Sequence, residues 1–428
     1  MVWKLRSNLL QFVSAQIRQI RKGGVEVGLQ KAQKLLVFGF ASLIAFLPMV
    51  VVRVMRPLIL IRMASIRNDR IGEFCAHSSY LLATKPTNRW LPLTFDWYFF
   101  SGISCNHQWE RMVTRKLFVH NWVRYLDFIN RWIPGGSGHV RPMAPSTRPI
   151  HGIFQKDILR FEFTSEESDR ALQWLSNIGW KIGQPFVCLQ VRDSAYLASV
   201  SKALGEKPDY WNYHSYRNSD IDNYRDAVRY LIERDYWVFR MGKVVEKPLL
   251  NQHKNFIDYP FLSNKDDLMD IWLTLNCNIF ISTGSGLDYL PPVYKGPSTL
   301  IVNALPLRDL NSWHWTTWTP KHLVWRKSGK YLTLQEHALH SYVNSSDYEL
   351  RGIRVIDLDA NEIKEAVMEH EQRICGQWQY SDEDLRLQAL FWAKFSGTLS
   401  FHKYHKWIHP EARAGAFYLR KMGDCFFE

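Results

Sequence analysis

Residues 278–303 read NIFISTGSGLDYLPPVYKGPSTLIVN. A predicted strand, Asn278–Ser282, runs into a turn of small residues, which is followed by a helical stretch and a second strand, Ser298–Asn303. Short apolar strands that alternate with helices are typical of a parallel sheet covered by helices on both faces. This stretch therefore predicts an α/β fold.

The same alternation extends upstream through the second half of the chain. Strands are expected at Phe186–Val191 and Trp237–Met241, with helices at about Asp220–Arg234 and Lys265–Leu275. A further helix is predicted at Ser165–Asn177, because a serine and two glutamates at its start are suited to capping.

The first half carries a weaker version of this pattern. Leu58–Arg62 and Phe95–Phe100 are predicted strands, and helices are predicted near Gly72 and from Cys105 to Leu117. A loop rich in Gly and Pro, Ile133–Pro149, interrupts all periodicity. We therefore predict two Rossmann-like domains that face a cleft. The expected parts are a membrane-associated segment, an N-terminal Rossmann-like domain, a C-terminal Rossmann-like domain and a helical extension, at residues 1–57, 58–178, 179–370 and 371–428.

The composition is that of a globular, basic protein. The chain has 428 residues, 46% of them hydrophobic and 22% charged, and its net charge of +13 indicates anionic partners. We expect no nucleic-acid partner, because the basic residues are dispersed and no known nucleic-acid-binding motif is present. The six cysteines include no CxxC pair, which argues against a zinc module and a dense disulfide framework and fits a reducing compartment.

An apolar segment near the N-terminus predicts membrane association. Leu35–Val52 contains 18 residues without a charge and follows a basic amphipathic stretch, Met1–Lys34. Basic residues flank the apolar segment on both sides, so its orientation and its mode of insertion stay open, and Pro48 interrupts it. A buried core helix is the alternative. A cleaved signal peptide is disfavoured, because a short basic start and a small-residue cleavage site are missing.

Thr283-Gly284-Ser285-Gly286 is the strongest candidate for a phosphate site. Glycine lets the backbone approach a phosphate, and the helix that follows offers free N–H groups. Arg192, Arg217 and Arg240 are expected at the same edge of the sheet, where they would clamp a diphosphate. The alternative is a tight strand-to-helix turn without a ligand.

Other polar residues have two interpretations each. Asp220 is a ligand contact or a helix N-cap, and His214 is a catalytic base or a structural histidine. Glu73 and Asp69, at a strand-to-helix turn of the first half, are candidate bases for an acceptor hydroxyl, and Asp69 is alternatively a cap.

No metal site is predicted. His402, His405 and His409 would share one face of a helix, but aromatic residues are interleaved with them and no carboxylate has a matching spacing. An amphipathic helix at a surface is the better interpretation.

Residues 213–243 read YHSYRNSDIDNYRDAVRYLIERDYWVFRMGK, and residues 281–303 read ISTGSGLDYLPPVYKGPSTLIVN. Both segments resemble a family of bacterial glycosyltransferases from surface-polysaccharide gene clusters. The similarity covers most of the chain after residue 58 and is densest from Phe186 to Leu307. It implies a GT-B-like fold, donor binding in the C-terminal half, and transfer of a sugar from a nucleotide-sugar to a surface-polysaccharide or glycolipid acceptor without a metal or cofactor.

The resemblance assigns donor binding to the polar residues at the strand ends. They are Arg192, Asp193, Arg217, Asn218, Ser219, Asp220, Arg240, Gly242, Ser282, Thr283, Gly284, Ser285 and Gly286. We expect catalytic roles for Glu73, Asp193 and His214. The predicted acceptor-binding residues are Arg67, Asn68, Asp69 and Arg70.

One position departs from the family pattern. Relatives carry Gly-His where this chain has Gly72-Glu73, so either Glu73 replaces that histidine as a base or the role has moved. The expected partners are a nucleotide-sugar, a glycan or lipid-linked acceptor and an anionic membrane surface, at the cytoplasmic face of the inner membrane. A non-catalytic, membrane-tethered nucleotide- or glycan-binding protein is the alternative.

Overall fold

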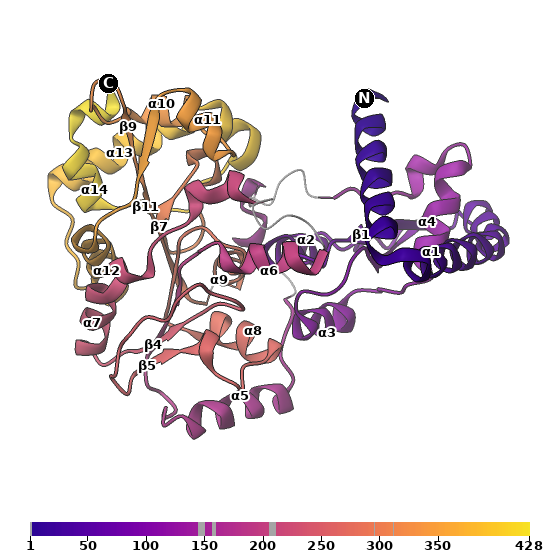
Figure 1. Cartoon of the computed structure of the whole chain (residues 1–428), viewed down its shortest axis with the longest axis horizontal. Helices are drawn as coiled ribbons and strands as arrows, with labels where there is room; N and C mark the ends of the chain where they lie inside the picture. Colours follow the sequence, from indigo (N-terminus) through magenta and orange to yellow (C-terminus); the bar gives the residue numbers. More distant parts are fainter. Residues whose placement is uncertain (1, 144–149, 156–159, 205–210, 295, 311) are drawn as a thin grey trace. The chain divides into compact units, whose positions relative to one another are not determined.

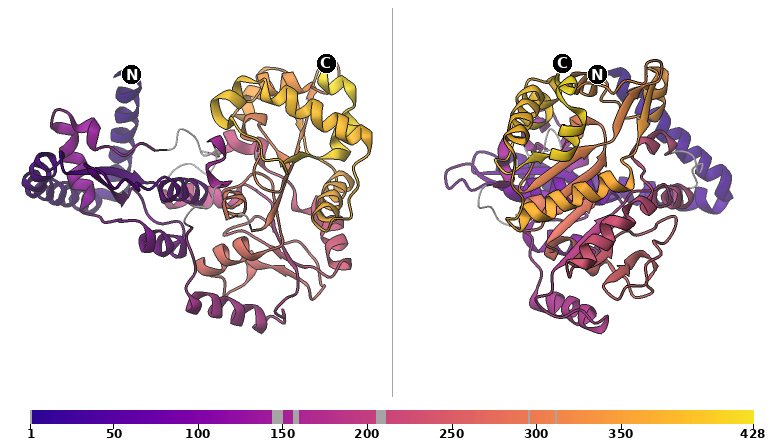
Figure 2. Two further views of the ribbon diagram at one scale, coloured as in Figure 1. Left: turned by 180° about the vertical axis from the view of Figure 1, so that it is seen from behind. Right: turned by 90° about the vertical axis from the view of Figure 1, so that its left-hand side faces the viewer.

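The computed structural model describes residues 2–143, 150–155, 160–204, 211–294, 296–310 and 312–428. By their internal contacts these residues form two compact units. Unit 1 comprises residues 1–66, 85–101 and 117–142, and unit 2 comprises residues 67–84, 102–116 and 143–428. Figures 1 and 2 show the ribbon of each unit.

Unit 1 contains a small parallel sheet, one long helical segment and one short helix. Its elements are α1 (Val2–Val54), β1 (Ile59–Ile66), β2 (Leu93–Phe100), α4 (Val123–Trp132) and the 3₁₀ turn η1 (Gly136–His139). The two strands pair in parallel from Ile59 opposite Leu93 to Ile66 opposite Phe100. Non-helical backbone at Gly24 divides α1 into two helices, and Pro48 lies in the second of them.

Unit 2 is built on a parallel sheet of seven strands. They are β3 (Phe186–Gln190), β4 (Trp237–Arg240), β5 (Phe256–Asp258), β6 (Ile279–Ser282), β7 (Ser298–Ala304), β8 (Thr316–Pro320) and β11 (Arg413–Ala414). Their spatial order is β5-β4-β3-β6-β7-β8-β11. The first six follow the order 3-2-1-4-5-6 of a Rossmann fold, with β3 as the first strand. A separate antiparallel pair joins β9 (His322–Trp325) to β10 (Ile353–Ile356).

The helices of unit 2 are distributed around this sheet. They are α2 (Ile71–Ala83), α3 (His107–Lys116), α5 (Ser165–Asn177), α6 (Ala195–Leu204), α7 (Arg225–Glu233), α8 (Asp267–Asn276), α9 (Leu290–Tyr294), α10 (Leu334–Leu339), α11 (Ser345–Leu350), α12 (Ala360–Ile374), α13 (Asp382–Ser396) and α14 (Ala416–Met422). Figure 1 shows α7 and α12 next to each other, and α8 close to α5.

Alternation along the central strands explains why both faces of the sheet are covered. Val187 and Leu189 of β3 pack in one apolar cluster with α7 and α12. Phe186, on the opposite face of the same strand, packs its ring against Trp272 of α8. Side chains of successive strand residues point to opposite faces, so a strand with no polar position in its interior needs helices on both sides.

The strands and helices predicted from the sequence are present with small shifts of their ends. The predicted helix at Asp220–Arg234 is a 3₁₀ turn, η4 (Ile221–Tyr224), followed by α7. The predicted helix at Ser165–Asn177 is confirmed as α5, and its N-cap is Thr164, whose side chain accepts a hydrogen bond from the backbone N–H of Glu167.

The compact units have other boundaries than the predicted domains. The helices α2 and α3, which follow β1 and β2 in the chain, belong to unit 2, as does α5. The main features of the described structure are thus a Rossmann-like seven-strand sheet, a small parallel sheet of two strands, and an apolar N-terminal helix. Because contacts decide which helix joins which core, chain order alone does not give these boundaries.

Candidate functional site: an arginine cluster at the Rossmann switch point

The strand order changes direction between β3 and β6. In open α/β sheets, ligands bind beyond the carboxyl ends of the strands at this switch point. Arg192 follows β3 there, and the turn Ser282–Gly286 follows β6. The two loops are joined by a hydrogen bond of 3.0 Å from the backbone N–H of Arg192 to the Thr283 hydroxyl.

The Ser282–Gly286 turn is held by its own polar groups. The Ser282 hydroxyl is fully buried, accepts hydrogen bonds from the backbone N–H groups of Gly284 and Ser285, and donates to Asp288. Gly284 has a φ of +80°, a conformation that favours glycine. The segment is therefore a tight turn, as the alternative interpretation predicts. It also lies at the edge of the sheet where ligands bind in such folds.

Glycine at position 286 is required by a close approach of α2. A Cβ atom on Gly286 would lie 2.8 Å from the side chain of Ile71 and 2.9 Å from the backbone nitrogen of Gly72. A Cβ atom on Gly72 would likewise lie 2.9 Å from the Cα of Gly286. The N-terminus of α2 thus packs directly on the turn after β6, within unit 2.

Three arginines from different segments gather beside this turn. They are Arg70 before α2, Arg192 after β3, and Arg217 at the end of the 3₁₀ turn η3 (Asn212–Arg217). Burial, together with the positive charge of Arg217 and then of Arg70, lowers the pKa of Arg192 to about 9. Arg217 donates a hydrogen bond to the carbonyl of Gly284, and Arg70 lies over the ring of Trp211 at 4.7 Å.

Among the residues that the structure describes, no carboxylate neutralises the positive charge of the cluster. No ion pair joins Arg70, Arg192 or Arg217 to a carboxylate among the described residues. All three arginines are half-buried, and cations that are partly removed from water are usually paired, because desolvation is costly. Such a group of arginines is suited to an anion that supplies the missing charge, and a diphosphate accepts hydrogen bonds from several guanidinium groups at once.

His214 responds to the same charges. Burial, followed by Arg192, Arg217 and Arg70, lowers its pKa to about 4, so the imidazole is neutral near pH 7. Its ring stacks on Trp211, with centroids 6.2 Å apart and planes 9° apart. A base with this pKa is poorly matched to proton transfer near neutral pH. A bound diphosphate would raise the pKa by offsetting the arginine charges.

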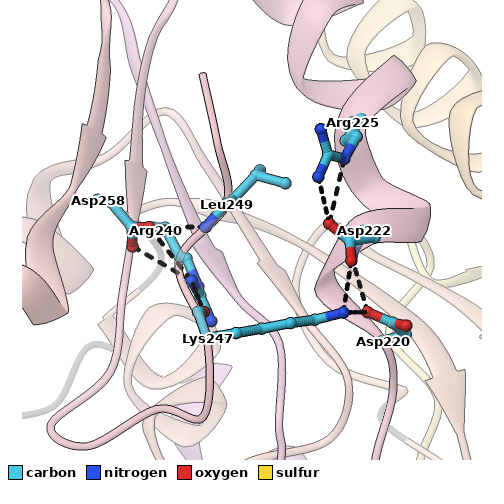
Figure 3. Close-up of polar contacts among 7 residues, drawn as sticks. All are labelled: Asp220, Asp222, Arg225, Arg240, Lys247, Leu249 and Asp258. Atoms are coloured by element: carbon cyan, nitrogen blue, oxygen red, sulfur yellow. Dashed lines mark hydrogen bonds and ion pairs between the residues drawn. The ribbon is translucent and has the colours of Figure 1, made fainter. Parts of the chain in front are cut away.

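A neighbouring pocket of about 250 Å³ opens at the carboxyl ends of β3 and β4. It is lined by Val191, Asp193, Ser219, Asp220, Ile221, Arg240, Glu246 and Lys247. Four of these residues are among the site residues that the sequence predicts, namely Asp193, Ser219, Asp220 and Arg240. Both basic side chains of this pocket, unlike the arginine cluster, form ion pairs, Lys247 with Asp220 and Arg240 with Asp258, as Figure 3 shows.

Arg240 is a structural residue of this pocket. Its side chain is 1% exposed, lies 3.3 Å from both carboxylate oxygens of Asp258, and donates to the carbonyl of Lys247 (Figure 3). The sequence pattern predicts that Arg240 clamps a diphosphate together with Arg192 and Arg217. The structure brings Arg192 and Arg217 together and gives Arg240 a carboxylate partner of its own.

The acidic residues near this pocket are also engaged. The Asp193 carboxylate accepts hydrogen bonds from the backbone N–H groups of Ala195 and Glu246, at 3.0 and 2.8 Å. Asp220 caps η4 by accepting from the N–H of Asp222, which confirms the capping interpretation, and it pairs with Lys247 at 2.7 Å. Lys247 also contacts the Asp222 carboxylate, as drawn in Figure 3.

Three further predicted donor residues hold loops in place. The Ser219 hydroxyl donates to Asp357, and the carbonyl of Asn218 accepts from Lys321. Gly242 has a φ of +147°, and a Cβ atom there would lie 2.7 Å from Val245.

The predicted acceptor group is divided by the structure. Arg67 forms ion pairs of 2.7 Å with both Asp69 and Glu73 on the exposed side of the turn, so Asp69 is not the cap of α2. Asn68 is buried and accepts a hydrogen bond from the N–H of Gly102. Arg70 belongs to the arginine cluster. The sequence pattern does not predict this, because only the packing of α2 on Gly286 places Arg70 there.

The three C-terminal histidines do not share a site. His405 bonds to the carbonyl of Arg308, whereas His409 contacts His314. Within the described ranges, no group of three or more His, Cys, Asp or Glu side chains is placed to hold a metal ion.

The chain was also compared with known proteins. No family model, no curated protein and no solved structure matches it.

Proposed function

We propose that this protein is a membrane-associated glycosyltransferase that moves a sugar from a nucleotide-sugar to a surface-polysaccharide or glycolipid acceptor. The observation that carries the proposal is the arginine cluster Arg70, Arg192 and Arg217 at the switch point of the seven-strand sheet. The cluster has the charge, the position and the neighbouring glycine turn that a nucleoside diphosphate needs. A GT-B-like fold, independence of a metal and a position at the cytoplasmic face of the inner membrane are parts of the same proposal.

The chemistry assigned to this site is displacement at the anomeric carbon. An acceptor hydroxyl forms the new C–O bond while the bond from the anomeric carbon to the diphosphate oxygen breaks. The diphosphate leaves with the electron pair, and Arg192 and Arg217 stabilise its charge; a preorganised donor of this kind typically contributes about 3–4 kcal/mol. Glu73 is the proposed acceptor of the hydroxyl proton, because it lies next to Gly72, which packs against the turn.

The first experiment is a thermal-shift screen of the detergent-purified protein with pyrophosphate, UDP, GDP, CMP and dTDP, with and without magnesium. A ligand at a hundredfold excess over its Kd is expected to stabilise the protein by about 2.7 kcal/mol. Arg192→Gln and Arg217→Gln are expected to weaken binding by about tenfold or more each, since a hydrogen bond to a charged group contributes roughly 1.5–3 kcal/mol.

The matched control is Arg386→Gln. It removes the same charge from unit 2, but Arg386 is half-exposed and already pairs with Glu383 and Asp424. Its variant should bind like the unmodified protein. The proposal fails if no anion shifts the unfolding temperature, or if all three variants bind equally well.

A non-catalytic nucleotide- or glycan-binding protein is the second candidate. This second candidate is favoured because the carboxylates of both predicted bases already have partners. Asp193 accepts two backbone hydrogen bonds, and Glu73 pairs with Arg67. The two candidates differ in turnover, measured as release of nucleoside diphosphate in the presence of membrane extracts. Glu73→Gln should lower turnover and nearly keep nucleotide affinity in a transferase, and a protein that binds nucleotide without any turnover is the binding protein.

A further inference from the structure

The second half of α1 presents a continuous apolar face. Residues Lys31–Val54 are long and apolar enough to cross a membrane, and only about a fifth of their most apolar stretch is buried. The side chains on the outer face are at least half exposed, namely Leu35, Leu36, Val37, Phe40, Leu43, Ile44, Phe46, Leu47, Val51 and Val54. Exposure of this extent excludes the core-helix alternative for the described structure and marks an interaction surface.

The inner face of the same helix belongs to the core of unit 1. Ala45, Met49 and Val52 are buried in one cluster with residues of β1 and α4. The Phe38 ring packs on Phe128 of α4 with centroids 5.1 Å apart. At the other end, Arg53 donates hydrogen bonds to backbone carbonyls at the end of α4. The helix is therefore attached to the folded unit from Phe38 to Arg53, over about 22 Å.

Charged groups lie on the elements to which this part of α1 is attached. Asp127 and Arg131 of α4 form an ion pair of 2.8 Å, and the Arg131 side chain is 62% exposed. On the strands, Asp96 pairs with Arg62 at 2.7 Å and with Arg141 at 2.8 Å. If α1 crossed the hydrocarbon core of about 30 Å, the attached α4 and its exposed Arg131 would enter the hydrocarbon as well. Each such charge costs at least about 2.5 kcal/mol at the centre of a bilayer.

An exposed tryptophan lies beside the apolar face. Trp132, at the end of α4, is 75% exposed and packs on Phe128, which contacts Phe38 of α1. An exposed tryptophan in this position is typical of the level of the lipid head groups. The residues of α1 include eight Lys or Arg and one acidic residue, Glu26, which complements an anionic membrane.

We propose that Leu35–Val54 lies in the plane of one leaflet, with its outer face in the acyl chains and its inner face held by unit 1. The occupant of the surface is an anionic lipid bilayer. Unit 1 as a whole is then a monotopic membrane module, and no part of α1 crosses the membrane. The inference rests on the membrane association in the proposed function and is independent of glycosyl transfer.

The decisive experiment compares the positions of the two ends of the full chain. Reporters that are active on only one side of the inner membrane, a fluorescent protein for the cytoplasm and alkaline phosphatase for the periplasm, are fused to the N-terminus or the C-terminus in a bacterial host. In-plane insertion predicts that both ends report the same side. Opposite sides for the two ends would show that α1 spans the membrane and would overturn the proposal.

A second experiment tests the bilayer as the occupant. The double variant Leu43→Gln/Leu47→Gln changes two exposed residues of the outer face, 74% and 69% exposed, and should lose most of its flotation with vesicles that contain anionic phospholipid. The control, Leu350→Gln/Leu399→Gln, changes two residues of unit 2 that are 84% and 89% exposed, and should float unchanged. The proposal is contradicted if the first variant still floats with the vesicles. If the unmodified protein proves to be a dimer in detergent and this variant is a monomer that still floats, a second copy of the chain covers the outer face instead of lipid.

The same variants separate this inference from the proposed function. Nucleotide binding takes place in unit 2 and should be unchanged in Leu43→Gln/Leu47→Gln. Loss of flotation with normal nucleotide binding supports the membrane module even if the transfer reaction is never found.

Discussion

Gly72→Ala tests whether the contact between α2 and the turn after β6 builds the arginine cluster. The added Cβ would lie 2.9 Å from the Cα of Gly286, 3.1 Å from its carbonyl oxygen, and 3.3 Å from the ring of Tyr289. Carbon atoms in favourable contact are about 3.5–4.0 Å apart, so the backbone of α2 must retreat by roughly 0.6–1 Å. The nearest atoms belong to the backbone of Gly286, which cannot change rotamer as a flexible side chain can.

The expected cost follows from two opposing terms. Overpacking of a well-packed site costs about 1–3 kcal/mol. Replacing glycine by alanine inside a helix stabilises the folded state by up to about 1 kcal/mol. The gain is smaller in the first turn, where Gly72 lies. We therefore expect a net destabilisation of about 1–2 kcal/mol. Because Arg70 moves with the end of α2, pyrophosphate binding should weaken by about threefold to tenfold, although no charged group has been removed.

The assay is thermal unfolding with and without pyrophosphate, next to Gly397→Ala as the control. Gly397 has a φ of −77°, and a Cβ atom there would lie 3.5 Å from its nearest neighbour, which is ordinary contact. The control should keep or slightly gain stability and should bind normally. If Gly72→Ala unfolds at the same temperature as the unmodified protein and binds pyrophosphate equally well, the close approach does not position the cluster.

Two further predictions concern buried charges. Arg240→Met should destabilise unit 2 by about 3–5 kcal/mol, since it leaves the half-buried Asp258 and a carbonyl without their partner; a denaturant midpoint equal to that of the unmodified protein would refute the structural role given to Arg240. Glu369 is fully buried, and burial raises its pKa to about 7, although its carboxylate accepts hydrogen bonds from Ala416 and Phe417. Between pH 4.5 and 7 the folded state therefore binds more protons than the unfolded state, and stability should fall as the pH rises through this window, by on the order of 3 kcal/mol. Glu369→Gln should remove this dependence in unfolding measured at a series of pH values, and an unchanged slope would exclude Glu369 as its source.

The central sheet could be predicted from the sequence because its strands are strongly apolar and end at polar loops. FVCLQV at 186–191 and NIFIS at 278–282 lie within one residue of β3 and β6. Their order in the sheet then places Arg192 and the 282–286 turn side by side. Local patterns were sufficient for this part of the site, because both segments belong to adjacent strands.

The remaining features depend on contacts between distant segments. Arg240 received its partner Asp258 from β5, a strand of three residues that has no periodic pattern to detect. Arg70 joined the cluster because two glycines more than 200 positions apart in the chain touch each other. The only local sign of that contact was glycine at the start of each segment, which equally fits an ordinary turn.

The interleaving of the two units has a consequence for how the chain is made. The helix α2 leaves the ribosome early, but the turn that covers its N-terminus follows about 200 residues later. At 5–20 residues per second, α2 waits roughly 10–40 s for this partner. Tyr80 and Ala83 of α2 pack against a cluster that includes Val293 and Trp313, and they lack these partners for that time. Synthesis of the early segments close to a membrane or a chaperone would protect them, and a fragment beginning after residue 142 would lack α2 and α3 altogether.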